Sequence, residues 1–264
     1  MFIPDLHLQR LISDSFYSFI GASWRKLYFC NMKKYIAILP FAFLLLLSLS
    51  FSCNTETEPE TKAPVLTGES NIDKINLQIE ANPENSDLYA LRAEMYYEKN
   101  SFDQAIQSMT MAMSIDSVNL DYHHLLADIY LDYFRSRLAL KTMERAVAIA
   151  PEDIASLLKL SEIQLYLKQN KASLITIDKV LRIDRQQALA FFFMGANFEE
   201  LGDMNRAINS YQEASEIDPE MLDTWIKLGQ LHASINGSRA GDFFDNAIEL
   251  DSTSTLALNA KAEY

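Results

Sequence analysis

The chain has 264 residues, 49% of them hydrophobic, and its 23 Lys and Arg against 36 Asp and Glu give a formal net charge of −13. That charge argues against nucleic acid as a partner, because the phosphates would be repelled, and favours cationic or neutral partners. Gly and Pro number only seven each, which favours helix over a turn-rich β fold, and two cysteines are too few for a disulfide framework or a zinc site.

A segment that starts at residue 32 has the sequence features of a secretory signal, although such signals normally stand at the very start of a chain. Met32-Lys33-Lys34 is a short basic start, and residues 35–51 form an uncharged run of apolar and small residues. A basic start, an apolar run and small residues in this order are typical of signal peptides. Residues 1–31 place acidic and basic side chains ahead of this signal. We therefore expect translation to start at Met32, which would make residues 1–31 a spurious extension.

The end of the signal, Ser50-Phe51-Ser52-Cys53, resembles the lipobox of bacterial lipoproteins. The resemblance implies that a signal peptide over residues 32–52 is removed and that the thiol of Cys53 receives a diacylglycerol. The mature chain would then be lipid-anchored in the bacterial cell envelope, at the outer membrane, on its periplasmic or surface face. Two alternatives stay open: a transmembrane anchor, for which the apolar run is at the short limit, and a plain cleaved signal.

Residues 53–70 are polar and acidic, contain Pro and show no apolar period. This composition predicts a disordered tether between the lipid and the fold.

An internal repeat with a period of about 34 residues fills the chain after the tether, from about residue 71. Three series in step with one another reveal it, and their members are Ala105, Ala139, Ser173 and Ala207; Ala112, Ala146, Val180 and Ala214; and Ile115, Ile149, Ile183 and Ile217. Small residues recur where helices touch and bulky ones recur beside them. A period of this length is typical of stacked helical hairpins, since one hairpin cannot bury its apolar face alone.

The repeat resembles the tetratricopeptide repeat, and the fourth unit matches that pattern best, with Phe191, Met194, Gly195, Phe198, Gly202, Ala207, Tyr211, Ala214 and Pro219. The resemblance implies an all-α fold, a right-handed α-solenoid of about five helical hairpins with partial units at its ends. The expected divisions are a half unit 71–85, units 86–119, 120–153, 154–187, 188–221 and 222–254, and the start of a further unit at 255–264.

Individual units depart from the pattern. The third is weakest, because Ser161, Gln164 and Ser173 replace small or aromatic residues, and the fifth is one residue short around Asn236-Gly237. The apolar face around Phe244 and Leu250 would be left partly bare at Tyr264, so we expect that the natural solenoid continues beyond that residue, and the alternative is that this end meets a partner.

Short signals mark where helices begin and end. Ser101 and Gln104 have the spacing of a capping box, and Gly202-Asp203 offers a turn followed by an N-cap. Pro151 and Pro219 fall where units should join.

No catalytic constellation, phosphate loop or metal-binding motif occurs in the sequence, so we expect no enzymatic activity, no cofactor and no metal. His123 and His124 are adjacent and point to different sides of a helix. We predict that His123 packs in the core and that His124 faces the inner groove. A metal site of His124 with Asp128 is the minor alternative to a solvated polar pair.

In tetratricopeptide-repeat proteins the first helix of each unit lines a concave groove, which implies a partner-binding role for the exposed positions of these helices. Carried over by position, the groove residues are Glu94, Tyr97, His124, Asp128, Leu131, Glu162, Tyr166, Phe192, Glu199 and Gln230. Carboxylates mixed with apolar side chains predict a basic or apolar peptide or protein.

Three functions fit this sequence. We expect a non-catalytic, lipid-anchored scaffold for protein–protein interaction in the cell envelope. The alternative is an accessory or regulatory subunit of an envelope enzyme or of a secretion or assembly complex, and a cell-surface sensor is a weaker third.

Overall fold

In the computed structural model, residues 68, 70–235 and 237–264 are described. They form twelve α-helices and no strand. The predicted extension, signal, Cys53 and most of the tether lie outside these residues. No helix of residues 70–235 and 237–264 is long and apolar enough to cross a bilayer.

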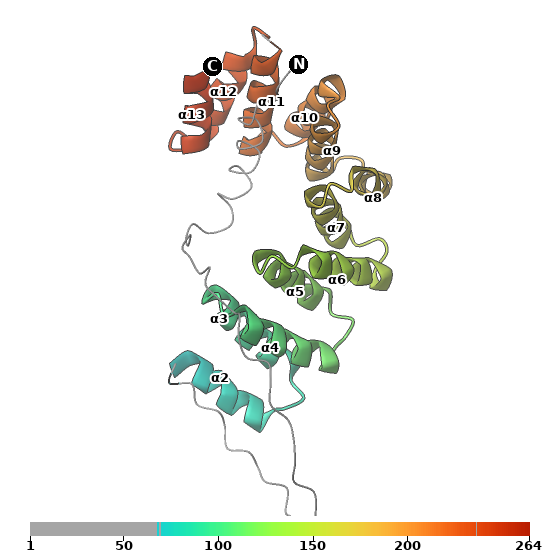
Figure 1. Ribbon diagram of the computed structural model, residues 1–264, viewed down its shortest axis with the longest axis vertical. Coiled ribbons are helices and arrows are strands. Elements are labelled where there is room, and N and C mark those ends of the chain that lie inside the picture. The colour runs from blue at the N-terminus through green and yellow to red at the C-terminus, as the bar shows by residue number, and fades with distance from the viewer. Residues whose placement is uncertain (1–67, 69, 236) are drawn as a thin grey trace, which may run out of the picture. The chain divides into compact units, whose positions relative to one another are not determined.

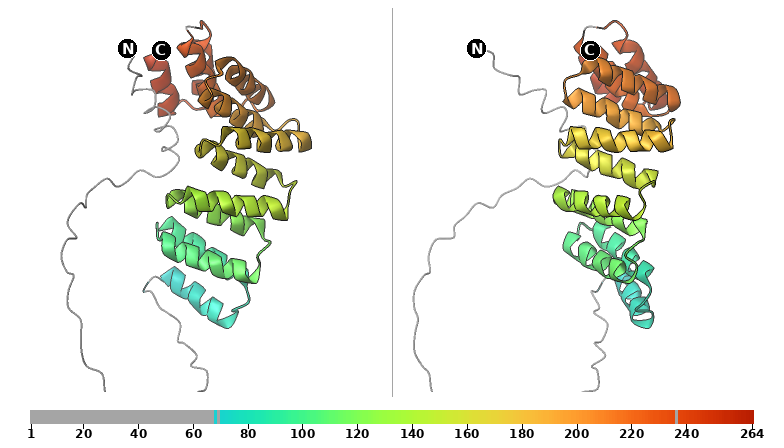
Figure 2. Two further views of the ribbon diagram at one scale, coloured as in Figure 1. Left: turned by 45° about the vertical axis from the view of Figure 1, so that its right-hand side comes forward. Right: turned by 90° about the vertical axis from the view of Figure 1, so that its right-hand side faces the viewer.

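The helices pack as consecutive pairs that stack in chain order (Figures 1 and 2). A single helix, α2 (Ser70–Ala81), comes first and α13 (Thr255–Glu263) comes last. The five pairs between them are α3 (Ser86–Glu98) with α4 (Phe102–Ile115), α5 (Leu120–Asp132) with α6 (Ser136–Ile149), α7 (Ile154–Tyr166) with α8 (Asn170–Ile183), α9 (Ala188–Glu200) with α10 (Met204–Ile217), and α11 (Leu222–Ser234) with α12 (Ala240–Leu250). The predicted all-α solenoid of helical hairpins is confirmed.

Side chains just before the first helices cap several of them. The Oδ1 atoms of Asn85 and Asn119 accept hydrogen bonds from the backbone N–H groups of Asp87 (3.1 Å) and Asp121 (3.0 Å). Each cap satisfies one of the donors that a helix N-terminus leaves without a partner. Asp203 caps α10 in the same way, which confirms that prediction.

The capping box predicted at Ser101 is wrong. Ser101 precedes α4, but its side chain makes no capping hydrogen bond. In a capping box the N-cap N–H would bond to the side chain of Gln104. Here that N–H donates instead to the carbonyl of Tyr96, at 2.8 Å, to close the end of α3.

One backbone turn joins the two helices of each of the first four pairs. After α3, the N–H of Asn100 donates to the Tyr97 carbonyl (2.8 Å) and that of Ser101 to the Tyr96 carbonyl (2.8 Å), which is a Schellman motif. The same two bonds recur at the equivalent positions after α5, α7 and α9. The motif places one residue in the left-handed region, and the four residues are Asn100, Phe134, Lys168 and Gly202, at φ 56°, 58°, 57° and 76°.

Replacing Phe134 by Gly is expected to raise the free energy of unfolding by about 0.5–1 kcal/mol, because Gly adopts the left-handed conformation without the steric cost that a side chain adds there. The Phe134 side chain is 75% exposed, so its removal sacrifices little packing. Urea denaturation of the full chain measures the change. The reverse control, Gly202→Ala, should lower stability by a similar amount, and two changes of the same sign would contradict the explanation.

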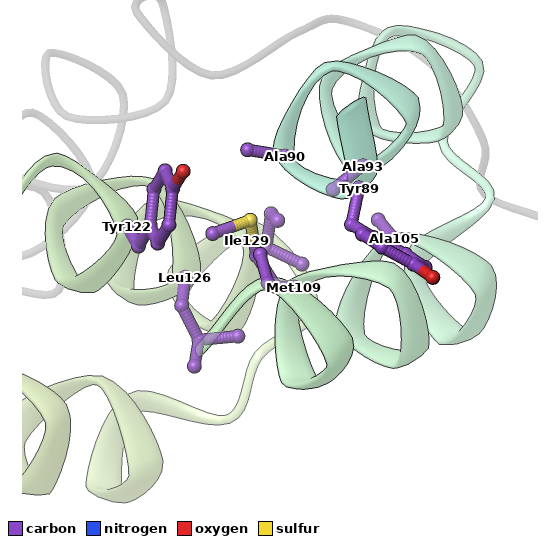
Figure 3. Close-up of a cluster of buried hydrophobic side chains, with 9 residues drawn as sticks. Tyr89, Ala90, Ala93, Ala105, Met109, Tyr122, Leu126 and Ile129 are labelled. Atoms are coloured by element: carbon purple, nitrogen blue, oxygen red, sulfur yellow. The ribbon is translucent and has the colours of Figure 1, made fainter. Parts of the chain in front are cut away.

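Small residues let the helices of each pair approach closely. Ala93, Ala127 and Ser161 on the first helices are fully buried, as are Ala105 and Ala139 on the second helices. Apolar contacts then continue from one pair to the next. Figure 3 shows such a cluster, in which Tyr89 and Ala93 of α3, Met109 of α4, and Tyr122 and Ile129 of α5 pack together. The core is therefore a row of neighbouring clusters along the stack, as expected of a solenoid.

The third pair replaces part of this apolar packing by buried hydrogen bonds. The Ser173 hydroxyl donates to the Ser161 carbonyl (2.8 Å) and accepts from Asn197 Nδ2 (2.9 Å). Beside it, Thr176 Oγ1 donates to Gln164 Oε1 at 2.8 Å. These side chains are buried, so the residues that depart most from the repeat pattern satisfy one another across α7, α8 and α9.

Candidate functional site

The first helices of the pairs form one side of the stack. α3 contacts α5, α5 contacts α7, and α7 contacts α9, in addition to the contacts that each makes with the second helix of its own pair. In Figure 1, α5 and α7 lie on one side of the stack and α6 and α8 on the other. We call the solvent-facing side of α3, α5, α7, α9 and α11 the first-helix surface, and all ten predicted groove residues belong to these helices.

The ten residues differ in exposure. Glu94 and Tyr166 are exposed, and the other eight are partly buried, namely Tyr97, His124, Asp128, Leu131, Glu162, Phe192, Glu199 and Gln230. The Phe192 ring packs against the rings of Phe193 and Tyr211, with centroids 6.0 and 5.4 Å apart. Phe192 therefore belongs partly to the core between α9 and α10.

Tyrosine hydroxyls connect α3 and α5. Tyr97 donates to Asp132 Oδ2 at 2.6 Å, and Tyr122 donates to Asp87 Oδ1 at 2.5 Å. Burial, and then the hydrogen bond to Asp132 and its charge, raise the pKa of Tyr97 well above its usual value. Both phenols therefore stay protonated and remain donors at neutral pH.

The two adjacent histidines have different surroundings. His123 is fully buried, with Nε2 3.1 Å from the Ser117 carbonyl, which confirms the prediction of core packing. His124 Nε2 lies 2.8 Å from the hydroxyl of Ser156 on α7. Asp128 contacts Lys159 instead, and residues 70–235 and 237–264 contain no group of three or more His, Cys, Asp and Glu that could hold a metal ion.

Lys159 lies between two of the predicted groove carboxylates. Its Nζ is 2.6 Å from Asp128 Oδ1 on α5 and 3.4 Å from Glu162 Oε2 on α7. Burial lowers the pKa of Lys159, but the two carboxylates outweigh burial and raise it. Lys159 therefore stays charged. It neutralises part of the negative charge that the sequence predicted for the partner-binding groove.

Glu199 is also held from within the chain. Lys227 on α11 places Nζ 3.1 Å from Glu199 Oε1, and the Tyr211 hydroxyl donates to Oε2 at 2.9 Å. The side chains of Lys227 and Glu199 are only 23% and 19% exposed. In contrast, Glu94 is exposed and forms no hydrogen bond or ion pair with another described residue. Of the four carboxylates predicted for the groove, Glu94 is thus the one most open to a partner.

One helix pair matches a known family. The family model of the tetratricopeptide repeat matches residues 188–221, which are the helix pair α9–α10. This helix pair is a tetratricopeptide repeat.

Several solved structures share this fold, and two of them, YrrB and TTC0263, are described as tetratricopeptide-repeat proteins. YrrB, described as having an unusual peptide-binding site, is 21% identical, with a TM-score of 0.52 over 72% of this chain and 99% of its own. MamA from Desulfovibrio magneticus RS-1 is 16% identical, with a TM-score of 0.55 over 64% and 97%. The thermophilic protein TTC0263 of Thermus thermophilus is 17% identical, with a TM-score of 0.57 over 67% and 97%. No curated protein matches the sequence.

Two lysines of the first-helix surface were missing from the predicted site. Lys159 on α7 and Lys227 on α11 occupy equivalent positions two repeats apart. The spacing of Lys159 and Glu162 permits contact on one helix face. That spacing was the available signal, whereas the contact of Lys159 with Asp128 depends on how α5 and α7 are placed.

Proposed function

We propose that this protein is a non-catalytic scaffold that binds a protein or peptide partner along its first-helix surface. The observation that supports the proposal is a set of contacts between neighbouring first helices, which fix the side chains of this surface in the absence of a partner. Tyr97, His124, Lys159 and Lys227 each reach the first helix of a neighbouring pair. A surface with fixed side chains loses less conformational entropy on binding. The peptide-binding site named for YrrB supports the same kind of ligand.

The charges favour a partner of mixed character. Because Asp128, Glu162 and Glu199 have lysine partners within the chain, we propose that apolar contact carries most of the affinity around Tyr166. A basic side chain of the partner would meet Glu94, at the α3 end of the surface. This refines the expectation of a basic or apolar partner, because the cationic part is confined to one end.

A matched pair of variants tests the first-helix surface. Partners are captured with the full chain from detergent-solubilised envelopes and identified by mass spectrometry, and the affinity of each purified partner is then measured. Glu94→Lys with Tyr166→Ala should weaken a partner at least about tenfold. The control, Glu213→Lys with Val118→Ala, makes the same charge change and also truncates an apolar side chain to Ala, at residues exposed elsewhere, and it should bind normally. Equal affinities for the two variants would rule out this surface.

We also propose that the scaffold is anchored to the cell envelope by a lipid on Cys53, which rests on the sequence of the signal. Cys53→Ser should move the protein from the membrane fraction to the soluble fraction of a bacterial host. The intact mass of the wild-type protein should include a diacylglycerol. A Cys53→Ser protein that stays with the membrane would exclude this anchor, and a mature protein that retains residues 32–52 would favour a transmembrane segment.

A further inference from the structure

Basic residues are concentrated in the middle of this acidic chain. Residues 135–185 contain ten Lys and Arg against six Asp and Glu, whereas the rest of the chain has 13 against 30. The sign of the local charge is therefore reversed over one part of the stack, at the second and third helix pairs.

The repeat places four of these basic side chains at two equivalent positions. Arg137 and Arg145 on α6 correspond to Lys171 and Lys179 on α8, each one repeat later. Eight residues of helix separate the members of each pair by about 12 Å. All four side chains are exposed, as is Lys141 between them on α6. The helices α6 and α8 lie on the same side of the stack, across from α5 and α7 (Figure 1), and we call these five exposed residues the basic surface.

Acidic side chains of the protein do little to neutralise this basic surface. Arg137, Lys141, Arg145, Lys171 and Lys179 form no ion pair with a residue of the described chain. Two carboxylates lie on the same helices. Glu144 is exposed on α6, and Asp178 on α8 is held by Arg182 at 2.7 Å. The contrast with Lys159 and Lys227, which are both paired, shows that the basic surface has charge available for another molecule.

An apolar hollow opens beside these charges. Its volume is about 480 Å³, and its lining residues are Lys171, Leu174, Ile175, Asp178 and Leu201. Ile175 and Leu201 are 53% and 56% exposed, although bulky aliphatic side chains favour burial. The hollow is open to solvent and has room for one bulky side chain.

We propose that the basic surface and the hollow together bind an acidic segment of a partner protein, which places one bulky apolar side chain among Leu174, Ile175 and Leu201. A short acidic segment experiences mainly the charges within about 8 Å, the screening length at physiological salt. An extended anionic surface such as a bilayer would also meet the acidic remainder of the chain and be repelled. The partner chemistry is thus opposite to that expected at Glu94, so the scaffold has two surfaces for two different partners.

Fluorescence anisotropy of the detergent-purified full chain tests the proposal. The probe is a labelled synthetic peptide with one central Phe flanked by Glu on both sides. Reversing two charges, Arg137→Glu with Lys171→Glu, should weaken binding at least about tenfold. The control Lys74→Glu, Asn71→Asp and Gln78→Glu lowers the net charge by the same amount on α2, where all three side chains are exposed. This control should bind as the wild type does.

A second variant tests the hollow. Ile175→Ser should weaken the Phe peptide several-fold but leave unchanged the weaker binding of a peptide with Ala in place of Phe. Circular dichroism and melting curves check that each variant is folded. The variant Glu94→Lys with Tyr166→Ala should bind the probe normally, which separates this surface from the first-helix surface.

Three outcomes would overturn the proposal. In the first, the α2 control loses as much affinity as the reversal at α6 and α8. In the second, a peptide with Lys in place of Glu binds as well as the probe. In the third, vesicles containing phosphatidylglycerol bind more tightly than the peptide and the same reversal abolishes that binding, which would assign the surface to a membrane.

Discussion

Gly229→Ala is expected to lower the free energy of unfolding by about 1–3 kcal/mol, although Ala in place of Gly normally stabilises a helix by about 0.5–1 kcal/mol. A Cβ atom at position 229 on α11 would lie 2.4 Å from Cε1 and 2.6 Å from Cδ1 of Phe244 on α12. The Phe244 side chain is only 1% exposed, so its ring cannot move aside without disturbing the core. A decrease in the free energy of unfolding on Gly229→Ala would therefore indicate that α11 and α12 approach closely at this position.

Gly241→Ala is the matched control, because it lies within α12 and its Cβ would meet only Tyr264 Cε1, at 3.7 Å. This variant should be stabilised by about 0.5–1 kcal/mol. Phe244→Leu is destabilising alone but should reduce the cost of Gly229→Ala in the double variant, because the smaller side chain leaves room for the methyl group. Urea denaturation of the wild type, of Gly229→Ala, of Phe244→Leu and of the double variant measures the coupling energy between the two positions. A stabilised Gly229→Ala protein would contradict the packing of α11 on α12.

Tyr211→Ala is expected to cost about 3–5 kcal/mol, the range for removing a large buried aromatic side chain. Tyr211 is fully buried on α10. Its ring lies where a Cβ atom of Gly195 would be only 2.8 Å from Cδ1, and it also packs against Phe192. Removal would leave a cavity between α9 and α10 at the centre of the best-matching repeat.

Tyr211→Phe separates the ring from the hydroxyl. It keeps the packing and removes only the hydrogen bond to the Glu199 carboxylate, so about 1.5–3 kcal/mol should be lost, and Lys227 still neutralises Glu199. Differential scanning calorimetry compares the two variants. Similar losses for Phe and Ala would mean that the hydroxyl, rather than the ring, is the main contribution.

The fold could be predicted because its determinants recur once in every repeat. Gly195 and Gly229 occupy equivalent positions, and each faces a bulky ring, Tyr211 or Phe244. Where a helix must approach its neighbour this closely, the residue has to be small, so the pattern of small and large residues predicts the pairing of helices. The weak third unit kept the same geometry because Ser173 and its neighbours form hydrogen bonds in place of apolar contacts.

The detailed chemistry of the first-helix surface could not be predicted in the same way. Lys159 and Asp128 lie on different hairpins, and the pair does not recur in the next repeat, where Phe193 occupies the position of Lys159. Their proximity depends on the stacking of α5 and α7 and on the side-chain conformations, which periodicity does not report. The capping box failed for a related reason. The N–H of Ser101 is needed to end the preceding helix, and a motif read within one helix does not take account of that.

The contacts between first helices also bear on how a chain of similar hairpins avoids joining the wrong neighbours as it folds. If the third pair were left out, α5 could pack on α9 with much of the small-to-large pattern preserved. Asp128 would then lie opposite Phe193, which occupies the position equivalent to Lys159 in the next repeat, and a partly buried carboxylate would lose its cation. Because the polar contacts differ from one junction to the next, a stack with a skipped hairpin is less stable than the correct one. The order of the repeats therefore depends on side chains outside the repeat pattern.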